Sequence, residues 1–218
     1  MNNREVRFIP FEMRAEEEDQ EALIVGMPIV FNQETDLGFC REVIEPTALD
    51  KADLKDVPLL AQHDFGMIPL ARSRNNNENS TMRLEVTAEG MIIRARLDIK
   101  NNPKAAELYS AIKRGDISGM SFAFIVDEDK WEGLDTDSPL RRVCSITRVF
   151  EVSAVTDPAY KGTSIQAAAK DEALESVKSS LESARQQLAN TRAKEAELER
   201  RREALERLEN LIKEVKGE

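Results

Sequence analysis

The sequence predicts an α+β protein in two parts: a β-rich domain over residues 1–163 and a charged helical segment over residues 164–218. Two observations support this prediction. Many short stretches of the first part alternate apolar and polar side chains, as half-buried strands do. The second part is built from strong helix formers and has no proline, no aromatic residue and no interior glycine.

The strands of the first part are expected to be short. Alternation predicts strands within residues 4–14 and within residues 82–99, where Glu89 and Gly90 form a turn. Residues 21–32 form a more continuous apolar run, which suits a strand covered on both faces. Further strand-like stretches occupy residues 120–127, 129–135 and 141–160.

Few helices are expected among these strands. Residues 45–54 resemble a short helix that begins near Pro46 or Thr47. Residues 101–116 give a clearer helix, because they contain a capping asparagine, a first-turn proline and a terminal glycine: Asn102, Pro103 and Gly115. Many short strands with few helices predict a mixed sheet or a closed barrel with helices packed around it.

The C-terminal helix carries an apolar stripe at spacings of three and four residues. The stripe weakens at Thr191 and Glu195. A solvated helix with a narrow seam and a self-associating coiled coil are both compatible with this pattern. The stripe consists of Leu174, Val177, Leu181, Ala184, Leu188, Leu198, Leu205, Leu208, Ile212 and Val215.

Composition argues against several classes of protein. The net charge of −10 argues against a nucleic-acid binder, and no apolar run approaches the ~18 residues that span a membrane. The first 21 residues lack a signal-peptide layout. Only two cysteines, Cys40 and Cys144, are present, which fits a reducing intracellular setting. With a single histidine, the chain has few residues that could act as zinc ligands, and we expect no metal or cofactor.

His63, in "VPLLAQHDFGMIP", is that single histidine. It is either a satisfied, half-buried side chain or a group that transfers protons. Its possible partner is Glu151 in "VFEVSAV", where strand alternation puts Glu151 on the face of Ser153. A carboxylate among apolar neighbours needs a partner, and the candidates are an arginine, Arg148 or Arg142, and the imidazole.

Ser121 is the third residue of interest. It opens the strand in "GDISGMSFAF", on the less bulky face. A serine, a histidine and an acid together supply a nucleophile, a general base and a group that orients the base. Ser118 is a rival nucleophile, and Cys144 is a weaker one that reads better as a small core residue.

The amino-acid sequences of three stretches resemble those of the prohead (capsid maturation) proteases of tailed bacteriophages, which are similar to herpesvirus assemblin. The stretches are "VPLLAQHD", "IKRGDISGMSFAF" and "FEVSAVTDPAYKGTSI", and the resemblance spans roughly residues 20–165. It implies an assemblin-like barrel and a serine endopeptidase in which His63 is the base, Ser121 the nucleophile and Glu151 the third member. Asp64 and Asp157 are rivals of Glu151.

The resemblance also implies partners and a place of action. It implies cleavage of the major capsid protein, of its scaffold segment and of the enzyme itself, inside the assembling procapsid in the host cytoplasm. Ala123 departs from the usual glycine, and Lys161 or main-chain N–H groups of residues 160–162 are candidate oxyanion donors. The helical segment is expected to be scaffold-like, to associate with other copies and to be self-cleaved near residues 163–172.

A non-enzymatic capsid assembly protein is the alternative. In that hypothesis the β-rich domain binds capsid protein, and the long charged helix acts as the scaffold. It gives no reason for Glu151 among apolar neighbours.

Overall fold

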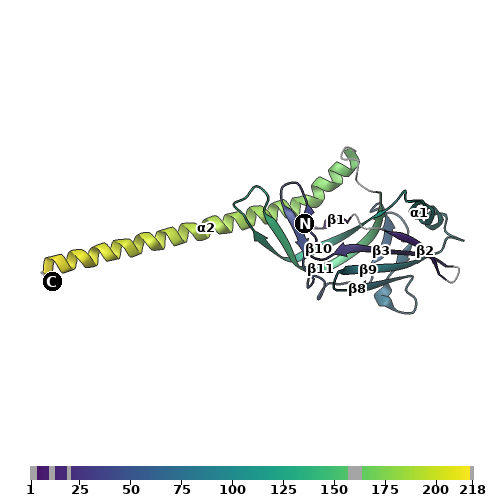
Figure 1. Ribbon diagram of the computed structural model, residues 1–218, viewed down its shortest axis with the longest axis horizontal. Coiled ribbons are helices and arrows are strands. Elements are labelled where there is room, and N and C mark those ends of the chain that lie inside the picture. The colour runs from purple at the N-terminus through teal and green to yellow at the C-terminus, as the bar shows by residue number, and fades with distance from the viewer. Residues whose placement is uncertain (1–3, 10–12, 19–20, 157–163, 217–218) are drawn as a thin grey trace. The chain divides into compact units, whose positions relative to one another are not determined.

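The computed structural model describes residues 4–9, 13–18, 21–156 and 164–216 (Figure 1). Two compact units divide the chain, Met1–Ser176 and Val177–Glu218. Among the described residues, the first unit holds the strands, one short helix, a 3-10 turn and the first turns of the long C-terminal helix, and the second unit is entirely helical. The predicted α+β class is therefore confirmed.

The first sheet has seven strands and is organised around one long antiparallel hairpin of β10 and β11. The other edge of β10 pairs with β1, and β11 pairs in parallel with both β5 and β6. Short strands β4 and β7 extend β5 and β6. The strands are β1 (Glu5–Ile9), β4 (Thr35–Asp36), β5 (Arg41–Ile44), β6 (Pro58–Ala61), β7 (Ala71–Arg72), β10 (Gly119–Glu132) and β11 (Leu140–Val155).

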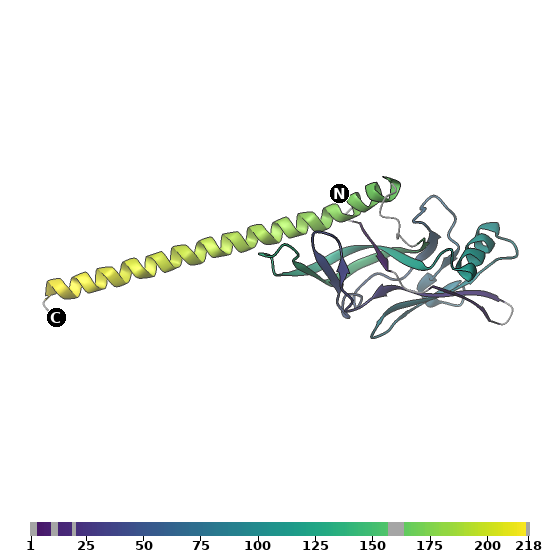
Figure 2. The same ribbon diagram turned by 45° about the horizontal axis from the view of Figure 1, so that its top comes forward.

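The second sheet has four antiparallel strands in the order β2-β3-β9-β8. They are β2 (Arg14–Glu18), β3 (Glu21–Val30), β8 (Met82–Val86) and β9 (Gly90–Leu97). Gly90 has a φ of 156°, and a Cβ there would meet the carbonyl oxygen of Ile29 at 2.0 Å, so this turn requires glycine. No ladder joins the two sheets among the described residues, so these strands form two layers and not a closed barrel (Figure 2).

One hydrophobic core includes side chains of both sheets. From β10 it takes Met120, Phe122 and Phe124, and from β9 it takes Ile93. Full burial of side chains of this size stabilises the fold by about 1.5–3 kcal/mol each. The opposite face of β10 carries Ser121, so alternation along this one strand separates core packing from the polar side chains described below.

Helix α1 (Pro103–Arg114) forms as predicted. The Asn102 side chain accepts hydrogen bonds from the main-chain N–H groups of Lys104 and Ala105. Gly115 ends the helix in the left-handed conformation, with a φ of 81°. A short 3-10 turn, η1 (Arg74–Asn76), precedes β8.

The helix predicted over residues 45–54 is wrong. The segment consists of successive turns, in one of which the N–H of Ala48 donates to the carbonyl of Glu45 at 2.9 Å, and its main chain also hydrogen-bonds to β11. The N–H of Ile146 donates to the carbonyl of Ala48 at 2.9 Å, and the N–H of Asp53 donates to the carbonyl of Thr147 at 2.9 Å. Pairing with a neighbouring strand therefore overrode the local helical signals.

Helix α2 (Ser164–Lys216) contains the helical segment predicted from residue 164. Its distal part exposes several leucines, Leu198, Leu205, Leu208 and Leu211, each with 55–60% of its surface accessible. None of the helices in the described ranges is both long enough and apolar enough to cross a membrane.

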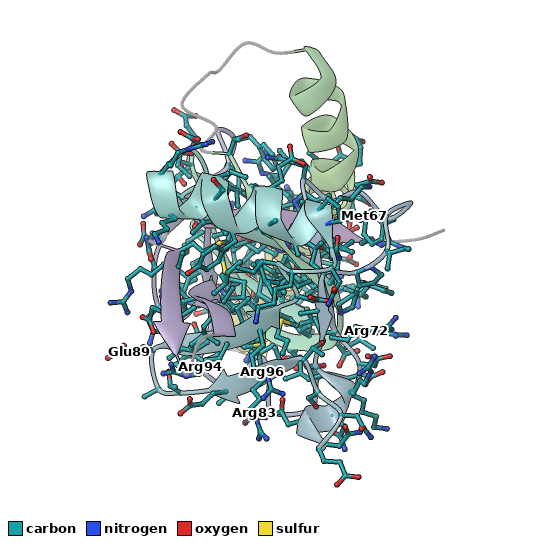
Figure 3. All side chains as sticks on the ribbon, turned by 90° about the vertical axis from the view of Figure 1, so that its right-hand side faces the viewer. Met67, Arg72, Arg83, Glu89, Arg94 and Arg96 are labelled. Atoms are coloured by element: carbon teal, nitrogen blue, oxygen red, sulfur yellow. The ribbon has the colours of Figure 1, made fainter. Side chains whose placement is uncertain are left out.

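Three arginines share the outer face of the second sheet (Figure 3). Arg83 of β8 lies directly opposite Arg94 of β9, and Arg96 follows two residues later on the same face. They line a shallow hollow of about 180 Å³ together with Leu23, Ser80 and Thr81. Like charges directly opposite each other destabilise a strand pair, so the Arg83–Arg94 pair lowers the stability of the β8–β9 pairing.

Candidate active site

His63 lies two residues after the end of β6, in the part of the first sheet where β6 runs parallel to β11. Its main chain has a φ of 57°, and that of Gln62 has a φ of 54°. Two consecutive non-glycine residues in the left-handed region are uncommon and need support from their surroundings. The N–H of Gln62 supplies part of that support by donating to the carbonyl of Ala154 at 3.0 Å.

Glu151 lies on β11 with no exposed surface, and it contacts the ring of His63. Its Oε1 is 2.7 Å from Nδ1 of His63. Because a carboxylate only accepts, this contact selects the tautomer that carries its proton on Nδ1. That tautomer leaves Nε2 as the basic nitrogen. About a quarter of the His63 side chain is exposed.

Ser153 connects the same two residues. Its hydroxyl donates to Oε2 of Glu151 at 2.6 Å and accepts the main-chain N–H of His63 at 3.2 Å. Sequence analysis put Ser153 on the face of Glu151 but assigned it no role. The available signal was its position two residues from a buried acid on a strand, where side chains share a face.

Ser121 lies on β10, directly opposite Ser153 on β11. It is 1% exposed, and its hydroxyl donates to the main-chain carbonyl of Arg7 on β1 at 2.7 Å. The structure thus brings His63 and Glu151 into contact and puts Ser121 one strand away from Glu151. Within the described residues, no hydrogen bond joins Ser121 to His63.

The arginines considered as partners of Glu151 have other partners. Arg142 pairs with Glu45 at 2.8 Å and with Glu132 at 2.6 Å. Arg148 lies 3.8 Å from Asp53. Within the portion of the chain that the structure describes, the Glu151 carboxylate therefore hydrogen-bonds to the imidazole and to a hydroxyl rather than to a guanidinium.

The rival residues lie elsewhere or have other contacts. Ser118 is exposed and precedes β10, and Asp64 accepts the N–H of Gly66 at 2.9 Å in its own turn. Burial raises the pKa of Cys144, which disfavours the thiolate that a nucleophile needs. Asp157 and the oxyanion candidates at residues 160–162 lie outside the described residues.

A buried ion network lies close to this site, and sequence analysis missed it. Arg7 and Arg141 share the carboxylates of Glu5 and Glu42, and all four side chains are at most 3% exposed. Arg141 also bonds Asp129 at 2.7 Å. The network joins β1, β5, β10 and β11, which are distant in sequence, and so only the folded sheet reveals it.

This network fixes the charge of Glu42. Burial alone would raise the pKa of Glu42, but the charges and hydrogen bonds of Arg7 and Arg141 outweigh it and lower that pKa below its ordinary value. The pKa of Arg141 is raised despite its burial, because Glu5, Glu42 and Asp129 surround it. Since the carbonyl of Arg7 accepts the hydroxyl of Ser121, the network also anchors the strand against which that hydroxyl rests.

The arrangement provides a partly exposed imidazole, an acid that fixes its tautomer, and a serine hydroxyl two strands away from the imidazole. These are the groups of acyl-transfer chemistry by a serine nucleophile. In the described residues, no group of three or more His, Cys, Asp or Glu side chains is placed to hold a metal ion.

Residues 10–179 match the family model of the caudovirus prohead serine proteases, and the chain belongs to this family. It is a serine protease with a role in phage capsid maturation. The predicted family and function are thereby confirmed, and the purely structural assembly protein is disfavoured.

A solved structure of the bacteriophage T4 capsid assembly protease gp21 is also similar. The sequences are 11% identical, the TM-score is 0.38, and the match covers 72% of this chain and all of the other. No curated protein matches the sequence.

Proposed function

We propose that the protein is a serine endopeptidase with a triad of Ser121, His63 and Glu151. One observation carries the proposal: the single histidine of the chain lies 2.7 Å from a carboxylate that is completely buried. A buried carboxylate on a histidine ring both orients the imidazole and stabilises its protonated form.

Each residue has a separate role in this proposal. The Ser121 hydroxyl attacks the scissile carbonyl while Nε2 of His63 takes its proton, and His63 then gives that proton to the leaving amine. Water hydrolyses the acyl-enzyme in the same way. Glu151 holds the Nδ1–H tautomer throughout.

Attack requires the Ser121 hydroxyl to leave the carbonyl of Arg7. Rotation about the Cα–Cβ bond moves the oxygen between staggered positions without moving β10. The residues lie on successive strands: Ser121 on β10, Ser153 opposite it on β11, and His63 beyond β11 after β6. The strand of Ser121, β10, and the strand that leads to His63, β6, are therefore separated by two strand spacings of about 4.8 Å each.

The substrates follow from the family. We infer that the enzyme cleaves the major capsid protein, its scaffold segment and its own chain, inside the assembling procapsid in the host cytoplasm. Residues 1–163 form the protease domain in this proposal, and residues 164–218 form a scaffold-like segment. Self-cleavage near residues 163–172 would require the first turns of α2 to unwind, because α2 begins at Ser164.

The proposal is tested by co-expressing the chain with its major capsid protein precursor and following both by intact-mass spectrometry. In Ser121→Ala, cleavage falls below detection, because loss of a serine nucleophile costs on the order of 10⁶-fold in kcat. The matched control is Ser118→Ala, which removes the exposed rival hydroxyl and leaves cleavage unchanged. Full processing by Ser121→Ala refutes the assignment.

A further inference from the structure

The Ser153 hydroxyl makes two hydrogen bonds that serve different parts of the site. Its proton goes to Oε2 of Glu151 at 2.6 Å, and its oxygen accepts the main-chain N–H of His63 at 3.2 Å. The other oxygen of Glu151 contacts the His63 ring at 2.7 Å. A closed set of three hydrogen-bond contacts therefore joins Ser153, Glu151 and His63. It involves both the imidazole and the main chain of the histidine.

These three contacts hold the Glu151 carboxylate and the His63 main chain, which would otherwise be free to move. Glu151 has one carboxylate oxygen that the imidazole does not occupy, and the carboxylate could rotate about its last bond without a second donor. His63 has a left-handed main chain, which its surroundings must maintain. Ser153 is itself completely buried, so water does not replace its hydroxyl readily.

We propose that Ser153 is a positioning residue of the protease: its hydroxyl fixes the rotation of the Glu151 carboxylate and the main chain of His63, and so keeps Nε2 of His63 as the basic nitrogen. This proposal rests on the proposed triad but concerns only the acid and the base. Ser153 does not touch the substrate in this role.

The single histidine permits a direct measurement. In the full-length chain labelled with ¹⁵N-histidine, every ring signal belongs to His63. With the ring neutral, the wild type is expected to give one tautomer with its proton on Nδ1. In Ser153→Ala the two ring nitrogen shifts should move toward each other, because the tautomers mix, and the Nδ1 proton should exchange with water about 10-fold faster or more.

The kinetic measurement uses a fluorophosphonate probe, which phosphonylates an activated serine: the serine O–P bond forms, fluoride leaves, and the base takes the hydroxyl proton. We expect the maximal labelling rate of Ser153→Ala to fall by about 10- to 100-fold, as for the loss of a hydrogen bond to a charged group. The probe concentration for half-maximal rate should stay within about twofold, because Ser153 makes no contact with the probe. Ser153→Thr retains the hydroxyl and should restore both the ring signals and the rate.

Ser73→Ala is the matched control. Ser73 is also completely buried, and its hydroxyl also accepts a main-chain N–H, that of Val57 at 2.8 Å. Its loss should lower the thermal midpoint to a similar extent without any change in the His63 ring signals. A general packing role for Ser153 would make the two variants alike in every measurement.

The outcomes separate this inference from the proposed function. Unchanged ring signals in folded Ser153→Ala overturn the positioning role, whatever the labelling rates are. Continued labelling of Ser121→Ala overturns the assignment of the nucleophile, while the ring signals still decide the role of Ser153. If Ser153→Ala does not fold, Ser153→Thr with disturbed ring signals contradicts the proposal, and Ser153→Thr with wild-type signals supports it.

Discussion

Glu151 is completely buried, so its carboxylate depends on neighbouring side chains for hydrogen bonds. Its imidazole partner comes from 88 residues earlier in the chain, and its hydroxyl partner from two residues later. Alternation in "VFEVSAV" was enough to single out Glu151 and to place Ser153 beside it. Sequence could not predict that the Ser121 hydroxyl rests on the carbonyl of Arg7, since that contact requires β1 to pair with β10.

Glu151→Gln tests the acid of the proposed triad. The amide has nearly the shape of the carboxylate but no charge, so the protein should fold while the histidine loses its orientation and its stabilised protonated form. We expect kcat to fall by about 10⁴-fold with little change in KM. The measurement is the rate of capsid precursor cleavage. Asp64→Asn is the control for the exposed rival and should keep wild-type activity; a Glu151→Gln rate within tenfold of wild type contradicts the role.

Glu42 makes stability depend on pH in a defined direction. Its pKa is lowered in the folded protein from an ordinary value of 4.5, so ionised Glu42 contributes stability above that value. The contribution is lost as the pH falls through the folded pKa. Urea unfolding from neutral pH to below pH 4.5 should show a smaller loss of stability for Glu42→Gln than for the wild type. Equal slopes for the two proteins rule out this coupling.

Single elements differ in how well local sequence predicts them. Helix α1 has its cap, its first-turn proline and its terminal glycine within its own sequence, and it forms as expected. Residues 45–54 carry similar local signals, yet their main chain bonds to β11. A neighbouring strand with free donors and acceptors decided the outcome, and such a neighbour is not visible in a local pattern.

The β8–β9 pair offers a test of stability at this scale. Arg83 faces Arg94 across the two strands, and both side chains are exposed. Arg83→Glu replaces a like-charge pair by an opposite-charge pair and should raise the free energy of unfolding by about 0.2–1 kcal/mol at low salt. Arg83→Gln should give a smaller gain, and added salt should reduce both. A loss of stability in Arg83→Glu contradicts the inference.

The whole chain combines a strand-rich unit with a long helix, and the domain boundary at residues 163 and 164 stays a prediction from sequence. The change of pattern at residue 164 coincides with the start of α2, whereas the compact units divide between Ser176 and Val177. The family model extends to residue 179. The change from strands to helix therefore occurs earlier in the chain than the boundary between the two compact units.

Self-association through α2 is the prediction at the scale of the molecule. Leu205 and Leu208 are more than half exposed and lie on the apolar stripe, and burial against a second copy would stabilise each by about 1.5–3 kcal/mol. We expect light scattering of the full chain to show an oligomer that Leu205→Lys with Leu208→Lys dissociates. Asn210→Lys, off the stripe, should leave the oligomer intact. A wild-type monomer at every concentration is the contrary result.

The order in which the ribosome makes the strands has a consequence for when proteolytic activity can begin. β11 is the last strand in the described part of the chain, and it lies between the strand that leads to His63 and the strand of Ser121. A nascent polypeptide that has not yet released β11 from the ribosome therefore lacks both the acid and the platform that joins the other two residues. We therefore expect the proposed triad to be inactive until β11 has been released and the first sheet is complete.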